Sequence, residues 1–162
     1  MMDHFRTLAL YNRLANERLY EACTALSDAE RRRDRGAFFR SVHGTLNHIL
    51  LGDRIWLARF EGRDVPSTGL DAELYGDFAD LRTARRAEDA RIEAFAASIR
   101  PGALTGSIRY VNNEGRSLED PLELLLFHFF NHQTHHRGQA HDLLCQAGHR
   151  GLVLDMHQVI RP

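Results

Sequence analysis

The sequence contains no lysine, so all 21 of its basic Lys and Arg side chains are arginine. This absence excludes a Schiff-base lysine and the lysine of a phosphate-binding P-loop. The formal net charge is only -1, so the chain lacks the cationic excess that binding to nucleic acid requires. No stretch approaches the length of a membrane span, and the N-terminal residues lack the apolar core of a signal peptide. We therefore expect a cytoplasmic protein that binds neither nucleic acid nor a membrane.

Cysteine is also scarce. Cys23 and Cys145 lie far apart in the sequence, do not form a CxxC pair, and both fall in helical patterns. We interpret them as small buried hydrophobic residues rather than as a disulfide or metal ligands. Histidine, in contrast, occurs ten times, which is more than a chain of this size needs. The excess favours a metal site or acid-base chemistry.

Length and composition are those of a globular protein. The 162 residues are 43% hydrophobic and 27% charged, which is enough to bury a substantial core. We expect one domain that spans residues 1–162.

The spacing of apolar residues predicts an all-α protein with four helices. We expect the first three helices at about 2–25, 39–60 and 72–99, and the fourth from Asp120-Pro121 to about Ala147. Between the third and fourth helices, from Leu104 to Leu118, the period changes to that of a strand. Ile108, Tyr110 and Val111 indicate the strand, and residues 112–115 indicate a turn. The sequence therefore predicts a small β-hairpin before the last helix.

Two histidines of the fourth predicted helix, His132 and His136, are four residues apart. On an α-helix this spacing places both imidazoles on one face, where they can bind a single metal ion. At 100° per residue, His136 falls near the middle of the apolar stripe of this helix and His132 near its edge. Two inward histidines carry a substantial desolvation cost, which a metal ion would offset.

A catalytic metal needs at least a third ligand, and the second predicted helix offers two candidates, His48 and His43. His48 lies beside Thr45 and Gly52, two small residues that would let another helix approach closely. His43 lies on a different face, so both residues cannot reach one ion. Periodicity alone does not choose between them.

The chain resembles the DinB family, within the DinB/YfiT-like group of proposed metalloenzymes. The resemblance is carried by residues 42–48 (VHGTLNH) with Asp53 and Trp56, and by residues 131–139 (NHQTHHRGQ) followed by Leu143-Leu144. It extends over nearly the whole chain, and the paired histidines with Arg-Gly-Gln are its most specific part.

The resemblance implies a four-helix bundle in up-down-down-up order, with a long crossover, and a homodimer. It also implies a metal ion bound by one histidine of the second helix and two of the fourth. These positions are His48, His132 and His136, so the resemblance selects His48 over His43. Asp53, Asn131 and His135 are candidates for groups that orient these ligands.

Three imidazoles suit a divalent zinc, nickel or iron ion and leave positions for water or substrate. Some relatives look like thiol transferases that use bacillithiol or mycothiol. We therefore expect a metal-dependent transferase or hydrolase that acts on a small molecule, with a low-molecular-weight thiol as one candidate substrate. The alternative is a non-catalytic metal-binding stress-response protein, in which the ion only ties two helices together.

Overall fold

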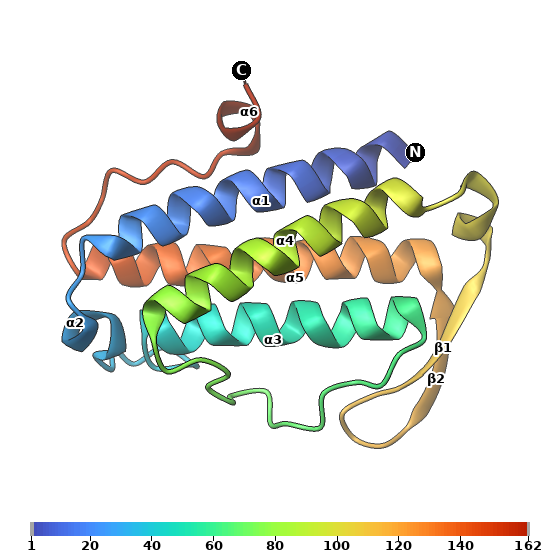
Figure 1. Ribbon diagram of the computed structural model, residues 1–162, viewed down its shortest axis with the longest axis horizontal. Coiled ribbons are helices and arrows are strands. Elements are labelled where there is room, and N and C mark those ends of the chain that lie inside the picture. The colour runs from blue at the N-terminus through green and yellow to red at the C-terminus, as the bar shows by residue number, and fades with distance from the viewer. Residues whose placement is uncertain (1, 162) are drawn as a thin grey trace.

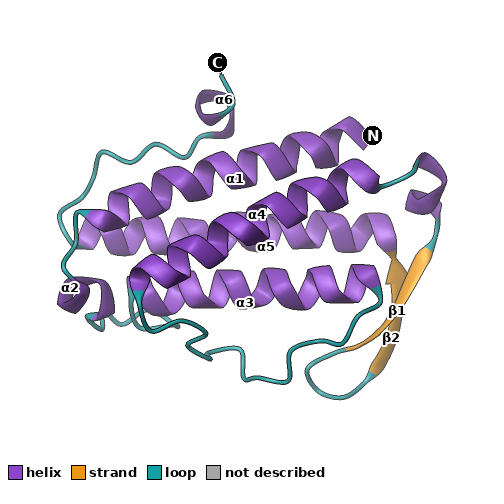
Figure 2. Ribbon diagram, viewed as in Figure 1, coloured by secondary structure: helices purple, strands orange, loops and turns teal. Residues whose placement is uncertain are grey.

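The computed structural model describes residues 2–161 and is mostly helical, with one small antiparallel sheet (Figures 1 and 2). The four long helices are α1 (Met2–Thr24), α3 (Val42–Glu61), α4 (Phe78–Ser98) and α5 (Leu122–Gln146). The shorter elements are α2 (Asp28–Arg32), the 3-10 helix η1 (Pro101–Thr105), strands β1 (Ser107–Val111) and β2 (Ser117–Pro121), and α6 (Met156–Val159). This confirms the predicted mostly helical class and the small hairpin before the last long helix.

The four long helices pack side by side, with α1 and α5 running in one direction and α3 and α4 in the other (Figure 1). The loop of residues 62–77 connects α3 to α4 and passes along the length of α3 (Figure 1). None of the helices in the described part of the chain is both long enough and apolar enough to cross a membrane.

Two helices begin later than the sequence predicted, because capping side chains fix their first turns. The hydroxyl of Ser41 accepts a hydrogen bond from the backbone N–H of Gly44, so α3 starts at Val42 and not at residue 39. The carboxylate of Asp77 accepts from the N–H groups of Ala79 and Asp80, so α4 starts at Phe78 and not at residue 72.

The fourth long helix also begins later than predicted. Asp120 and Pro121 belong to strand β2, in register with Ile108 and Ser107, and α5 starts at Leu122. The N–H of Leu122 donates to the carbonyl of Gly106, which joins the end of the hairpin to the first turn of α5. Proline is tolerated at the end of a strand, because there it removes no hydrogen-bond donor from the interior of the sheet. Pro121 therefore ends β2, and α5 begins at the next residue.

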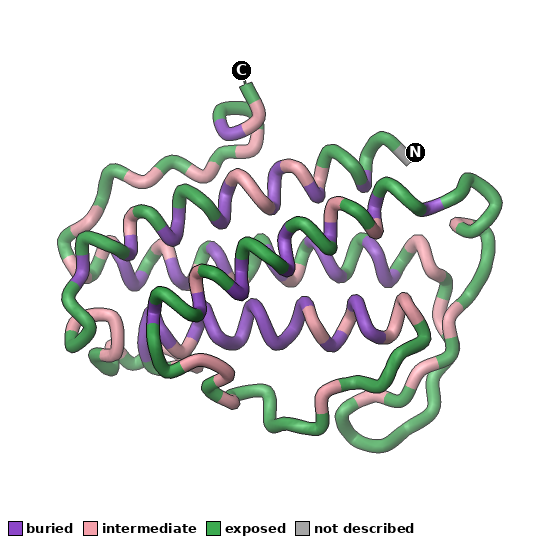
Figure 3. Tube along the Cα trace, in the orientation of Figure 1, coloured by how far each residue is buried: buried purple, intermediate pink, exposed green. Residues whose placement is uncertain are grey.

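The apolar core has two main parts, one toward each end of the long helices, and the buried faces of the helices point inward (Figure 3). The first cluster includes Leu19, Leu46, Leu81 and Leu144. The second, nearer the hairpin, includes residues of the same four helices: Phe5, Leu57, Ile92, Phe129. The C-terminal segment packs against α1, where the hydroxyl of Tyr11 donates to the carbonyl of Leu154.

Between the two apolar clusters lies a layer of buried polar side chains, which we call the interior polar layer. It comprises Asn12 and Asn16 of α1, Asp53 of α3, Arg85 and Asp89 of α4, and Gln133 and Arg137 of α5.

The layer joins all four long helices. Arg85 donates to Asp53 at 2.6 Å and pairs with Asp89 at 3.0 Å. Gln133 donates to the second oxygen of Asp53 at 2.9 Å. Asn12 and Asn16 both donate to Asp89, and Arg137 donates to Asn12.

Replacing Arg85 by alanine should strongly destabilise the fold. It would leave Asp53 and Asp89 buried without their counter-charge, a change that costs about 3–5 kcal/mol when one partner of a buried ion pair is removed. Urea unfolding measures the loss of free energy. Arg86→Ala, on the exposed side of the same helix, is the matched control and should change stability by less than about 0.5 kcal/mol. Equal stability of the two variants would contradict this role of Arg85.

Candidate metal centre

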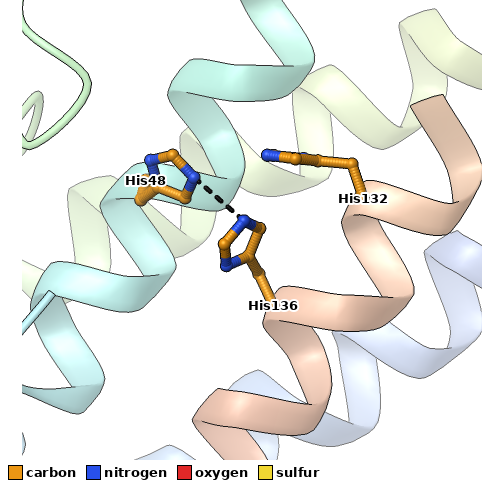
Figure 4. Close-up of side chains that lie close together, drawn as sticks. All are labelled: His48, His132 and His136. Atoms are coloured by element: carbon orange, nitrogen blue, oxygen red, sulfur yellow. Dashed lines mark hydrogen bonds between the residues drawn. The ribbon is translucent and has the colours of Figure 1, made fainter. Parts of the chain in front are cut away.

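Three histidines meet where α3 lies beside α5. His48 comes from α3, and His132 and His136 come from successive turns of α5 (Figure 4). One ring nitrogen from each of the three lies within 4.8 Å of the other two, and Nε2 of His48 is 3.2 Å from Nε2 of His136. Nitrogens bound to one tetrahedral zinc ion at about 2.0–2.1 Å lie about 3.3 Å apart. The three histidines could therefore hold a metal ion.

The outer nitrogens of two of these rings have partners that fix their orientation. Nδ1 of His48 donates to the carbonyl of Leu70 at 2.8 Å, and Nδ1 of His136 lies 2.8 Å from Oε1 of Gln139. With the proton on Nδ1, each Nε2 carries a lone pair and cannot donate to the other. Two lone pairs at this distance repel unless they share a cation, and this is the arrangement of metal-binding histidines.

Burial keeps the three imidazoles neutral. Burial first, and then the neighbouring rings of His136 and His48, lower the pKa of His132 to about 3. Burial is also the main cause that lowers the pKa of His48 and of His136. Nδ1 of His132 is buried and has no hydrogen-bond partner within residues 2–161. Neutral imidazole is the form that binds a metal ion. Because their pKa values are lowered, the three rings are already neutral near pH 7 and can bind a metal ion without first releasing a proton.

Gly52 allows His132 to approach α3. A Cβ atom at residue 52 would lie 2.7 Å from Cε1 of His132, which is closer than real Cβ contacts come. The expectation that small residues beside His48 permit a close helix contact is confirmed for Gly52.

An aromatic ring covers one side of the histidines. The ring of Phe39 stacks on His48, with 3.7 Å between ring centroids and an interplanar angle of 17°. The same ring presents its edge to His136 at 5.6 Å. Phe39 lies in the tight turn that precedes α3, in which the next residue, Arg40, has a φ of 65°. The sequence analysis did not identify Phe39, because the turn interrupts the predicted helix at this point.

The model of the DinB family matches residues 1–161 of the chain. The chain belongs to the DinB family. It is similar to Protein DinB of Bacillus subtilis (strain 168), with 24% identity over 159 residues, 96% of this chain and 92% of that protein. It also resembles the crystal structure of a DinB-like protein from Bacillus cereus ATCC 10987, with a TM-score of 0.62 and 21% identity, over 86% of this chain and 88% of the other. At this identity the structural likeness shows the fold alone.

In this DinB-family chain, His48 and not His43 lies beside the histidine pair of α5. His43 is 1% exposed, and its Nε2 lies 2.9 Å from the carbonyl of Tyr75 in the α3–α4 loop. His43 is therefore engaged by the α3–α4 loop and is not part of the group of three histidines.

The three candidates for orienting groups differ in their positions. Asp53 belongs to the interior polar layer and bonds Arg85 and Gln133. Asn131 is exposed. The ring of His135 contacts that of His136, with 4.8 Å between centroids, and its Nε2 lies 3.2 Å from Nε2 of Gln139. Gln139 was missed as an orienting residue, although it lies three residues after His136, a spacing at which helical side chains meet.

The predicted phase of α5 was partly wrong. Its most deeply buried middle residues are Gln133 and Arg137, while His132 and His136 are only partly buried. The apolar stripe therefore does not have His136 at its centre, and both histidines face α3 from the edge of the buried face.

The two cysteines do not join the cluster. Both are free thiols; Cys23 is buried, as predicted, whereas Cys145 is only partly buried. Burial raises the pKa of the Cys23 thiol to about 12.

Replacing Gly52 by alanine should displace His132 and destabilise the protein by about 1–3 kcal/mol, the usual cost of overpacking. Gly138→Ala is the matched control on α5, because a Cβ at residue 138 meets nothing within 4 Å. Alanine at an open helical position should stabilise by up to about 1 kcal/mol. Thermal or urea unfolding measures both, and a Gly52→Ala variant as stable as the unmodified chain would show that residue 52 does not limit the approach of His132.

Proposed function

We propose that His48, His132 and His136 bind one divalent metal ion in a four-helix bundle that forms a single DinB-like domain of residues 1–162. The observation that carries this proposal is the 3.2 Å approach of two Nε2 atoms whose outer nitrogens are already engaged. The donor set suits zinc, nickel or iron. Membership of the DinB family supports the same three ligands.

The cluster has the composition of a site with an open position. Among the described residues, no carboxylate or thiolate joins the three histidines, and three protein ligands are the pattern of catalytic rather than structural zinc. A divalent ion bound there would lower the pKa of a bound water or thiol. The chain would hold this ion with neutral rings and orient two of them through Leu70 and Gln139.

We propose that the chain is a metal-dependent transferase or hydrolase that acts on a small molecule, with a low-molecular-weight thiol as the favoured nucleophile. The chain itself offers no lysine, and the buried thiol of Cys23 has a raised pKa. Neither cysteine belongs to the histidine group, and we infer that the nucleophile comes from outside the chain, as a thiol or as water. The resemblance to thiol transferases favours the thiol.

One observation favours a second function, that of a non-catalytic metal-binding stress-response protein. The ring of Phe39 lies flat on His48 and presents its edge to His136, so it limits access to the cluster from that side. An ion held behind it would tie α3 to α5 without meeting a substrate.

We also propose that the protein is cytoplasmic and forms a homodimer. Leu124 and Phe127 on the outer face of α5 are 57% and 47% exposed. They offer an apolar surface that a second copy of the chain would cover.

Alanine substitution of the three histidines tests metal binding. Metal analysis of purified His48→Ala, His132→Ala and His136→Ala should show loss of the bound metal, because removing a direct ligand costs more than the roughly 10- to 100-fold in metal affinity that loss of an outer partner costs. His43→Ala is the matched control, since it removes the other histidine of α3 and should retain metal. Metal retained in stoichiometric amount by the three ligand variants would overturn the proposed site.

Spectroscopy of cobalt-substituted protein separates the two functions. Addition of a small thiol should produce a sulfur-to-metal charge-transfer band, because a thiolate would occupy the open position. The His132→Ala variant treated in the same way should lack the band, which excludes free cobalt as its source. An unchanged spectrum with thiols and with small anions would favour the non-catalytic protein.

A further inference from the structure

A cavity of about 810 Å³ lies between the α3–α4 loop, the C-terminal end of α3 and the β-hairpin. Its charged lining residues are three arginines and one aspartate: Arg59, Arg63, Arg109 and Asp64. Three positive charges less one negative charge give the lining a net charge of +2, whereas the whole chain has a net charge of -1. The cavity is therefore suited to an anion.

The three arginines of the cavity are not equivalent. Arg63 pairs with Glu61 at 3.2 Å, and Arg109 pairs with Glu119 at 2.7 Å. Arg59 has no carboxylate partner in the part of the chain that the structure describes. Its Nη2 donates to the carbonyl of Val111 at 3.0 Å and to Oδ1 of Asn113 at 3.2 Å.

The guanidinium of Arg59 lies against two aromatic rings that contact each other, with 5.5 Å between their centroids. It lies 4.6 Å from the ring centroid of Trp56 and 5.0 Å from that of Tyr110. Tyr110 is fixed in turn, because its hydroxyl donates to Asp120 at 2.9 Å. Burial lowers the pKa of Arg59, and its Nε is buried without a partner within residues 2–161.

This arrangement gives Arg59 more than a structural role. Fastening the hairpin to α3 needs the donors on Nη2 but does not need a positive charge without a carboxylate partner. Arg59 is only partly buried, but its charge has no carboxylate beside it, so an anion in the cavity could bind it through a charge-assisted hydrogen bond.

The apolar lining indicates an organic anion rather than a simple ion. Val65, Leu70 and Val111 line the cavity and are 36%, 43% and 54% exposed. These side chains would contact the carbon skeleton of a ligand whose charged group binds Arg59.

We propose that this cavity binds a small organic anion, and that Arg59 binds its carboxylate or phosphate group. Two contacts connect the cavity to the histidine cluster. Leu70 lines the cavity, and its backbone carbonyl accepts a hydrogen bond from Nδ1 of His48.

On the other side, the ring of Trp56, on which Arg59 stacks, lies 5.0 Å from that of His128, which lies 6.1 Å from that of His132. If the histidine cluster is the site of reaction, as the proposed function has it, the cavity would bind the anionic end of the substrate, remote from its reacting group. Anion binding itself needs no metal.

Trp56 is the only tryptophan of the chain, so its fluorescence reports directly on Arg59. We would titrate chelated, metal-free protein with inorganic phosphate and, separately, with succinate, at constant ionic strength kept with sodium chloride. A saturable change in fluorescence with either probe is the expected result, and the probe that saturates identifies the preferred group.

The affinity should fall roughly 10-fold or more in Arg59→Gln, which loses the charge. It should fall less in Arg59→Lys, which keeps the charge but loses the fork of donors. Arg150→Gln is the matched control, because it removes the same charge from an exposed position outside the cavity, and its affinity should be unchanged. Circular dichroism confirms that each variant is folded.

Three outcomes would overturn the inference: no saturable response in the unmodified protein, equal affinity in folded Arg59→Gln or Arg59→Lys, or a response that appears only when metal is bound. The last outcome would place the anion on the metal and not on Arg59. Saturable binding to the metal-free protein together with absence of metal from the purified protein would retain this inference and overturn the proposed function.

Discussion

The arrangement of the long helices depends on one carboxylate, that of Asp53. It is buried on α3 and accepts hydrogen bonds from Arg85 of α4 and Gln133 of α5. A buried charge tolerates few alternative positions, because any shift that breaks its bonds leaves it unsatisfied. Gly52 directly precedes Asp53 in the sequence, and His132 directly precedes Gln133. Gly52 and His132 make the close contact between α3 and α5. The same turns of α3 and α5 thus fix the relative position of the two helices through Asp53 and Gln133. They also bring the three histidines together.

Arginine serves several purposes in this lysine-free chain, and its surroundings distinguish them. Arg85 is fully buried but lies between two carboxylates, so its charge is balanced. Arg137 is also buried, and it donates to Asn12 and faces the ring of Tyr11. Arg59 lies against the rings of Trp56 and Tyr110 at the wall of a cavity. A planar cation that stacks and also forms directed hydrogen bonds can fill all three positions, whereas an ammonium group could not.

The sequence was sufficient for the helices and for the histidine pair, because both depend on spacing along one helix. The first residues of α3 and α4 were less predictable. The capping hydrogen bonds of Ser41 and Asp77 determine them, and the spacing of apolar residues carries no information about capping. The phase of α5 was misjudged because Gln133 and Arg137 are buried although they are polar. Their burial depends on partners on α1 and α3, which no local pattern contains. The choice of His48 over His43 required the resemblance, and the contacts of Leu70 and Phe39 depend on how loops return to the helices.

The contact between the α3–α4 loop and His48 is made by the backbone carbonyl of Leu70. A backbone carbonyl is present whatever side chain residue 70 carries. The orientation of the histidine is therefore insulated from most substitutions in the loop, while the same substitutions would reshape the cavity that the loop lines. Substitutions in the loop would therefore change the lining of the cavity and leave the backbone contact to His48 in place.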